Sequence, residues 1–250
     1  SPHWGTGRHS RVSELTVEES EVQLRSALED ADLVLITAGM GGGTGTRAAP
    51  YIGTVAKEMG AFVLGMVTTP FSFEGSRRTA EAIASVSRLR PAVDNLIVVQ
   101  SDRLLRFVGQ DADVVEAFSK ADEVITQGML GVSELLNNQV EDNIDFADVR
   151  TLLSYPGGTL MAVGLGYGHT GAMEAAQEAI GCPLLNLSIR NARGILLSLT
   201  GGQDLTLDKV NSAGALVAGS VKDKPRMILG TTIDRALEDQ VQLTLIATGL

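Results

Sequence analysis

The chain has 250 residues, of which 44% are apolar and only 4% aromatic, and it carries 20 basic against 30 acidic side chains. This composition excludes disordered, collagen-like and disulfide-stapled proteins. A net charge of −10 argues against a nucleic-acid partner, because binding a phosphate backbone requires clustered Lys and Arg. Cys182 is the single cysteine, and no apolar run reaches the length of about 18 residues that predicts membrane insertion. We therefore expect a soluble, cytoplasmic protein of one large or two small domains.

The first half of the chain alternates short apolar runs with longer amphipathic stretches, the pattern of a parallel sheet covered by helices. The run Leu33 to Ile36 is apolar on both faces, as expected for a buried parallel strand. The predicted strands lie at 32–38, 61–68 and 94–99, and the predicted helices at 16–30, 47–59 and 74–89.

A single long helix is predicted over 111–138, because apolar residues recur there every three or four positions. Gly128 and Gly131 would each weaken a helix by about 1 kcal/mol, so they predict close packing against a neighbour. A helix buried between two domains would explain both its length and its glycines.

The remainder of the chain predicts a second α/β unit after a polar segment at 139–148. Its expected strands lie at 158–166, 193–200, 226–232 and 240–247, and its expected helices at 170–180 and 206–220. The last two strands are joined by a short connection, which favours antiparallel pairing. The sequence thus predicts an α/β protein with one domain over 1–110, a connecting helix over 111–138 and a smaller α/β domain with a mixed sheet over 139–250.

A glycine-rich loop between a predicted strand and a helix is the most informative segment. Residues 39–46 read Gly-Met-Gly-Gly-Gly-Thr-Gly-Thr, and backbone N–H groups of such a loop can surround a phosphate at a helix N-terminus. The alternative is a tight turn that uses glycine only for steric relief. A Walker A loop is excluded because the first lysine, Lys57, lies too far downstream. A dinucleotide-binding loop would need an acidic residue near the end of the next strand, where residues 66–69 have none.

The segment from Ile36 to Thr46 resembles the tubulin signature of the FtsZ branch of the tubulin/FtsZ superfamily, the GTP-dependent polymerising proteins of bacterial division. Residues 69–78, 118–124 and 143–150 are similar to three further motifs of this family, in the family's order. The resemblance extends from about residue 17 to Leu250. It implies a Rossmann-like GTPase domain that binds GTP or GDP, with Mg²⁺ on the phosphates.

The resemblance also implies roles for individual residues. The phosphate loop would comprise Gly41, Gly42, Gly43, Thr44, Gly45 and Thr46. Glu74 and Arg78 would contact the ribose, although an ordinary ion pair is an alternative for them. Phe118 would stack on guanine and Asp122 would accept its N1–H and N2–H groups. The alternatives are a core position for Phe118 and a plain surface acid for Asp122.

The catalytic residues implied by the resemblance are Asn143, Asp145 and Asp148, in the loop that completes the nucleotide pocket of the next subunit. Two carboxylates three residues apart can orient and polarise a water near a terminal phosphate. An acid-rich helix start is the alternative. The implied assembly is a head-to-tail homopolymer at the division site, where further division proteins would bind. The spacing of His3, His9 and His169 is not typical of a metal site, so none is expected.

The sequence departs from the family pattern in several places. The family's first strand and its glycine-rich loop are not matched, so we expect the N-terminal part of the GTPase domain to be lacking. Arg47 stands where the signature usually ends in Gly, and either crowds the phosphates or pairs with one. Two hypotheses follow: a GTP-hydrolysing, filament-forming protein of septal-ring assembly, or a non-catalytic truncated relative that caps or modulates filaments without binding GTP well.

Overall fold

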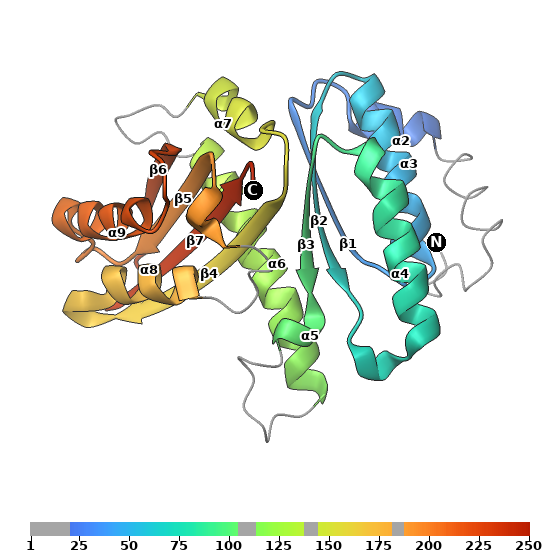
Figure 1. Ribbon diagram of the computed structural model, residues 1–250. Coiled ribbons are helices and arrows are strands. Elements are labelled where there is room, and N and C mark those ends of the chain that lie inside the picture. Colours follow the sequence, from blue (N-terminus) through green and yellow to red (C-terminus); the bar gives the residue numbers. More distant parts are fainter. Residues whose placement is uncertain (1–20, 105–113, 138–144, 182–187) are drawn as a thin grey trace. The chain divides into compact units, whose positions relative to one another are not determined.

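The computed structural model describes residues 21–104, 114–137, 145–181 and 188–250 (Figure 1). Contacts between residues divide the chain into two compact units, Ser1–Ala117 and Phe118–Leu250. Among the described residues, none of the helices combines the length and the apolar character that crossing a membrane requires.

The first unit contains a three-stranded parallel sheet in the order β1-β2-β3. Its strands are β1 (Leu33–Gly39), β2 (Phe62–Thr69) and β3 (Asn95–Gln100). Six consecutive residues of β2 are buried, as expected for the central strand of a parallel sheet. The three predicted strands and their parallel arrangement are confirmed, with each boundary shifted by one residue.

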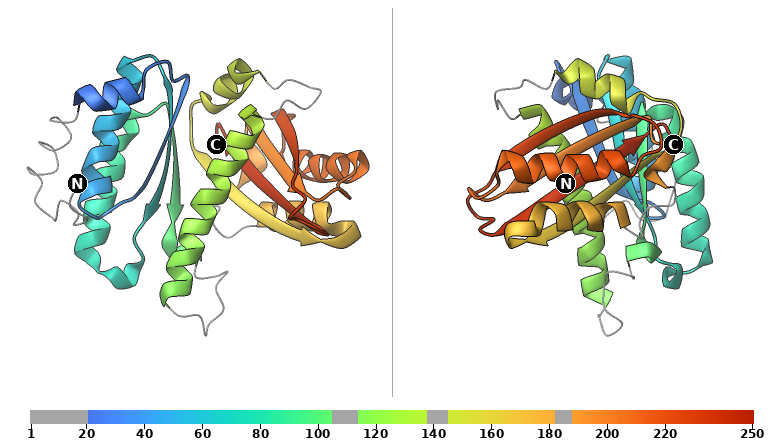
Figure 2. Two further views of the ribbon diagram at one scale, coloured as in Figure 1. Left: turned by 180° about the vertical axis from the view of Figure 1, so that it is seen from behind. Right: turned by 60° about the vertical axis from the view of Figure 1, so that its left-hand side comes forward.

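The helices α3 and α4 cover one face of this sheet (Figures 1 and 2). The helices and short 3₁₀ turns of the unit are α2 (Glu21–Ala27), α3 (Thr44–Glu58), η1 (Ser72–Glu74), α4 (Ser76–Leu89), η2 (Arg90–Ala92) and α5 (Ser101–Leu104). Helix α3 begins three residues earlier than predicted, because its first turn includes the end of the glycine-rich segment. Helix α5 was not predicted from the sequence.

The second unit contains a four-stranded mixed sheet in the order β4-β7-β5-β6. Its strands are β4 (Thr159–Tyr167), β5 (Gly194–Gly201), β6 (Arg226–Ile233) and β7 (Gln240–Thr248). Strand β7 runs antiparallel to both β4 and β5, and β6 runs parallel to β5. The predicted mixed sheet is confirmed.

The predicted pairing of the last two strands is wrong, because β5 lies between β6 and β7. The connection from β6 to β7 passes over the end of β5, where the Asp234 N–H donates to the Gly201 carbonyl at 2.9 Å. A side chain at Gly202 would lie 2.6 Å from the Leu237 carbonyl oxygen of the same connection. The short connection therefore reverses the direction of the chain from β6 to β7, and these two strands lie on either side of β5.

Helices cover both faces of this second sheet. They are α6 (Val114–Asn137), which begins just before the unit boundary, α7 (Phe146–Leu153), α8 (Gly171–Gly181) and α9 (Leu207–Gly219), with the short turns η3 (Gly168–Thr170) and η4 (Ile189–Asn191). Gly131 of α6 packs on Thr244, whereas Gly171 of α8 packs on Val241. Since residues 241 and 244 point to opposite faces of β7, α6 and α8 lie on opposite sides of the sheet.

Two further expectations can be compared with these helices. The long helix predicted over 111–138 is confirmed as α6 within the described residues, and the close packing predicted for Gly131 is confirmed by Thr244, whose Cβ would lie 2.9 Å from an added Cβ. The segment 139–148 was described as polar, with an acid-rich helix start as the alternative for Asp145 and Asp148, and α7 does begin at Phe146. Helix α7 forms because its apolar residues Val149, Leu152 and Leu153 are buried on one side.

Candidate functional site

Two hydrogen bonds hold the start of the glycine-rich loop, one to strand β2 and one to the first turn of α3. Strand β1 ends at Gly39, and the next N–H, that of Met40, donates to the carbonyl of Thr68 in β2 at 2.9 Å. The N–H of Gly41 donates to Thr46 Oγ1 at 2.9 Å, and Thr46 is fully buried in the first turn of α3. These bonds fix the backbone of the loop at the carboxyl edge of the sheet, the edge at which ligands bind in open α/β folds.

Steric relief explains some of the glycines but not all of them. Gly41 has φ +88°, and a Cβ there would lie 2.6 Å from the Arg78 carbonyl oxygen. At Gly45 a Cβ would lie 3.0 Å from the Cβ of Ala38. At Gly42, in contrast, no described atom would lie within 4 Å of an added Cβ. The tight-turn alternative thus accounts for Gly41 and Gly45, whereas Gly42 leaves space beside the backbone for a ligand.

Two helices of this unit begin with unusual electrostatics. The N-cap residues of α3 and α4 are Gly43 and Gly75, which have no side chain with which to cap. Neither helix, both lying within the described residues, has an acidic residue in its first turn, and α4 has Arg77 and Arg78 there. The helix dipole stabilises a negative charge at the N-terminal end of a helix by about 0.3–1 kcal/mol, so basic residues at this end are unfavourable unless an anion is bound there. The arrangement is suited to an anionic ligand.

Glu74 and Arg78 lie beside the glycine loop and form an ion pair. Arg78 Nη1 lies 2.8 Å from Glu74 Oε2, and the Glu74 side chain is only 9% exposed. Glu74 Oε1 also accepts the Phe71 N–H at 2.8 Å. Because Arg78 packs against Gly41, the structure brings the ion pair and the loop together. The ion-pair alternative is confirmed, and contact with a ribose stays a prediction.

Asp102 lies near Glu74 and Arg78, and it was not predicted as a site residue from the sequence. It lies in α5, directly after β3, and its Oδ1 accepts the Ser72 N–H at 2.7 Å. The only available signal was its position after a predicted strand, since carboxyl ends of parallel strands meet at one edge of the sheet.

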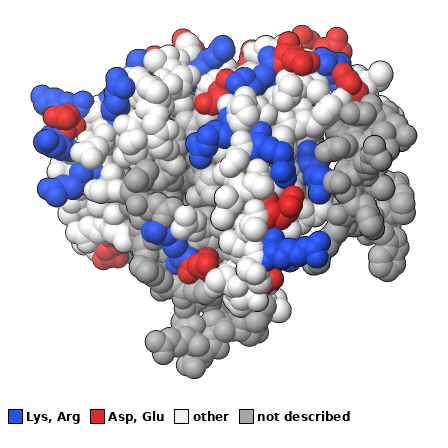
Figure 3. Space-filling model, turned by 45° about the vertical axis from the view of Figure 1, so that its right-hand side comes forward, with Lys and Arg blue, Asp and Glu red and all other residues white. Residues whose placement is uncertain are grey.

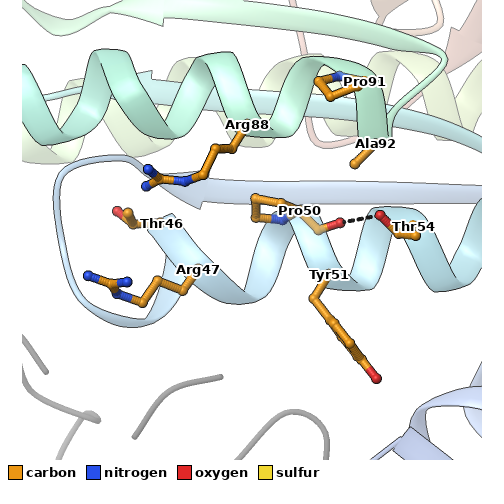
Figure 4. A pocket seen from close by; sticks show the side chains of 8 residues that line it. All are labelled: Thr46, Arg47, Pro50, Tyr51, Thr54, Arg88, Pro91 and Ala92. Carbon is orange, nitrogen blue, oxygen red and sulfur yellow. Dashed lines mark hydrogen bonds between the residues drawn. The ribbon is translucent and has the colours of Figure 1, made fainter. Parts of the chain in front are cut away.

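A pocket of about 510 Å³ lies between α3 and the end of α4 (Figure 4). It is lined by Thr46, Arg47, Pro50, Tyr51, Thr54, Arg88, Pro91 and Ala92. Figure 4 shows Arg47 and Arg88 reaching the end of the pocket at which α3 begins. On the face turned forward in Figure 3, Lys and Arg side chains occupy several separate places, with Asp and Glu side chains among them. The Arg47 side chain thus lines this pocket at the end where α3 begins.

The residues predicted to bind guanine lie one turn apart on α6. Phe118 is 41% exposed, so the alternative of a core position is wrong. Asp122 is also exposed, and its backbone carbonyl accepts the Thr126 hydroxyl at 2.8 Å. Both side chains can therefore meet a ligand, and a guanine contact stays a prediction.

The predicted catalytic carboxylates lie at the start of α7, while Asn143 lies outside the described residues. Asp145 is the N-cap of α7, and its side chain accepts the Ala147 N–H at 3.0 Å. Asp148 is exposed in the first turn and forms an ion pair with Arg226 of β6. The alternative of an acid-rich helix start thus describes this geometry, and a catalytic role stays a prediction.

No group of three His, Cys, Asp or Glu side chains within the described parts of the chain is arranged to hold a metal ion.

Two family models match the chain. The model of the Tubulin/FtsZ family, GTPase domain, matches residues 1–109, and that of the FtsZ family, C-terminal domain, matches residues 157–250.

Solved structures resemble the chain over almost its whole length. An FtsZ of M. jannaschii with a tryptophan-to-tyrosine substitution has a TM-score of 0.92 and 34% identity, covering 98% of this chain and 74% of that chain. An empty FtsZ dimer of M. jannaschii has a TM-score of 0.90 and 35% identity, covering 98% and 71%. CetZ1 from Haloferax volcanii, a GDP-bound monomer, shares the fold at 19% identity and a TM-score of 0.78, covering 98% and 74%.

Proposed function

The chain belongs to the tubulin/FtsZ family, and on that premise we propose that it is a GTP-binding, GTP-hydrolysing and filament-forming protein of the FtsZ type that acts in cell division. The observation that carries the proposal is the glycine loop at the carboxyl edge of the parallel sheet. This loop has ligand space at Gly42 and lies against Arg78 in the first turn of α4.

In this proposal the nucleotide phosphates bind to backbone N–H groups of Gly41–Thr46, at the N-terminus of α3. Glu74 and Arg78 contact the ribose, for which their ion pair has to open or rearrange. Phe118 stacks on guanine, and Asp122 accepts both N1–H and N2–H, a pair of donors that adenine lacks. Mg²⁺ bound to the phosphates offsets their negative charge.

Hydrolysis is proposed to require a second copy of the chain. Asn143, Asp145 and Asp148 of one subunit orient and polarise a water against the terminal phosphate bound to its neighbour. A contact of this head-to-tail kind is open-ended and generates filaments. Self-association is supported by the FtsZ dimer among the similar structures. The filament would assemble in the cytoplasm, at the division site.

The first test is equilibrium binding of GTP, with ATP as the control, to the folded chain in Mg²⁺ buffer. We expect GTP to bind at least tenfold more tightly than ATP, because one carboxylate pairs with two guanine donors. We also expect the turnover per subunit to rise with protein concentration, since two subunits form each complete site. A folded chain that binds neither nucleotide would overturn the proposal and support a filament-capping relative instead.

A further inference from the structure

We propose that Asp102 is a positioning residue, which holds the segment 70–75 so that Glu74 and Arg78 are set for the ribose. This inference rests on the proposed function. It starts from a hydrogen bond between two segments that leave the same edge of the parallel sheet.

Asp102 joins the end of β3 to the segment that follows β2. The two strands are neighbours, with Thr69 opposite Gln100 at their last paired position. Two residues after Gln100, the Asp102 carboxylate accepts the Ser72 N–H at 2.7 Å. A hydrogen bond from a backbone N–H to an ionised carboxylate is stronger than one between neutral groups. This contact fixes the backbone at the start of η1.

The backbone at this point in turn fixes the orientation of Glu74. The N–H of Phe71, the residue next to Ser72, donates to Glu74 Oε1. The other oxygen, Oε2, pairs with Arg78, which packs against Gly41 of the glycine loop. The contacts form a continuous path from Asp102 through Glu74 to the proposed phosphate loop.

The fold should tolerate the loss of this contact. Phe71 is 1% exposed and stacks on Phe73 with ring centroids 5.0 Å apart, so it anchors the segment independently. Asp102 itself is exposed, and the Ser72 N–H is able to bond to water once the carboxylate is removed. The expected effect of a substitution is therefore local loosening of residues 70–75.

The test compares three variants of the full chain, Asp102→Ala, Asp102→Asn and Asp32→Ala. The Asn variant keeps an acceptor oxygen. Asp32 is an exposed acid at the opposite end of the sheet and controls for the change in charge. We expect Asp102→Ala to weaken GTP binding about three- to tenfold and to reduce the preference for GTP over 2′-deoxy-GTP. We expect Asp102→Asn to restore both quantities, and Asp32→Ala to leave both unchanged.

The rate of amide hydrogen exchange at Ser72 gives a second readout. We expect this rate to be higher in Asp102→Ala than in the unsubstituted chain, and to return toward the unsubstituted value in Asp102→Asn. Faster exchange with unchanged ribose selectivity would reduce Asp102 to a structural contact and overturn the positioning role. Unchanged exchange and unchanged selectivity would overturn it as well. If the unsubstituted chain did not bind GTP at all, the proposed function would fail, and this inference with it.

Discussion

Two helix starts of the first unit, those of α3 and α4, contrast with two of the second unit, those of α7 and α9. In the first unit, α3 and α4 begin with the glycine N-caps Gly43 and Gly75, and α4 has two arginines in its first turn. In the second unit, α7 and α9 begin with side-chain caps, Asp145 and Thr206. Each of these also has an acidic first-turn residue, which complements the helix dipole.

This difference indicates where an external anion has a role. The start of α7 is already stabilised by its own cap, so its two carboxylates do not need a ligand, and both lie exposed. The starts of α3 and α4 lack this internal complement. A phosphate group at the first unit would supply it, whereas the second unit is suited to presenting carboxylates outward.

The largest effect is expected from Asp145→Asn. Asparagine is about as good an N-cap as aspartate, so the substitution removes the carboxylate and keeps the cap. We expect GTP turnover to fall about 100-fold or more, with unchanged GTP affinity and melting temperature. Steady-state turnover, binding and thermal unfolding measure the three quantities.

Two matched variants complete this test. Asp208→Asn removes the first-turn acid of α9 and should leave turnover unchanged. Asp145→Ala removes cap and carboxylate together, and should additionally destabilise the chain by about 0.5–2 kcal/mol. Normal turnover in Asp145→Asn would show that the start of α7 is only a capped helix.

The second effect is expected from Gly42→Ala, since an added Cβ there meets no described atom within 4 Å but enters the proposed ligand space. We expect GTP affinity to fall about tenfold or more, without a change in melting temperature. Gly219→Ala, at the end of α9, also adds a Cβ in open space and is the control. Unchanged GTP affinity would mean that no phosphate approaches Gly42.

A smaller effect is expected from Arg47→Gln. Removing this charge from the start of α3 should weaken GTP binding about threefold, and the difference should shrink at high salt. Arg25→Gln, in an ion-paired arginine of α2, controls for the loss of charge. Tighter GTP binding by Arg47→Gln would instead show that the Arg47 side chain crowds the phosphates. Titrations at two salt concentrations distinguish these results.

The smallest effects concern one carboxyl group in each unit. The Tyr51 hydroxyl and Arg25 lower the pKa of Glu21, and Lys209 lowers the pKa of Asp204 by hydrogen bonding. A carboxyl group whose pKa is lower in the folded than in the unfolded chain stabilises the fold at a pH above its unfolded-state pKa. This stability is lost as the pH falls through its folded-state pKa. Glu21→Gln and Asp204→Asn should therefore be less stable than the unsubstituted chain at pH 7.

Urea unfolding at neutral and acidic pH measures this pair of effects. The stability differences should shrink as the pH falls below the ordinary carboxyl pKa and should vanish once both carboxyl groups are protonated in the folded state. A difference that persisted at acidic pH would trace to packing rather than to charge.

Much of the fold could be predicted because its signals are local. Uninterrupted apolar runs such as Leu33 to Ile36 identified the parallel strands, and the three- to four-residue repeat identified α6. The start of α7 was expected only as an alternative, because polar residues precede it, although Asp145 as a cap before Val149 and Leu152 was a readable signal. The glycine loop and its place at the sheet edge were likewise predictable from sequence.

Contacts that depend on tertiary register could not be predicted. The insertion of β5 between β6 and β7 is decided by packing among strands far apart in sequence. The Asp148–Arg226 pair and the Asp102–Ser72 hydrogen bond also join distant segments. The first of these determines how a predicted catalytic carboxylate is held, so sequence identified the residue but not its partner.

The position of β7 has a consequence for how the chain is made. This strand comes last among the described strands, yet it lies inside its sheet, between β4 and β5. Among the residues that the structure describes, β4 pairs with β7 alone, so β4 emerges from the ribosome long before this partner exists. The second unit cannot close this sheet during synthesis until residues 240–248 have been added, so we expect the sheet to close only after β4, β5 and β6 have all been made.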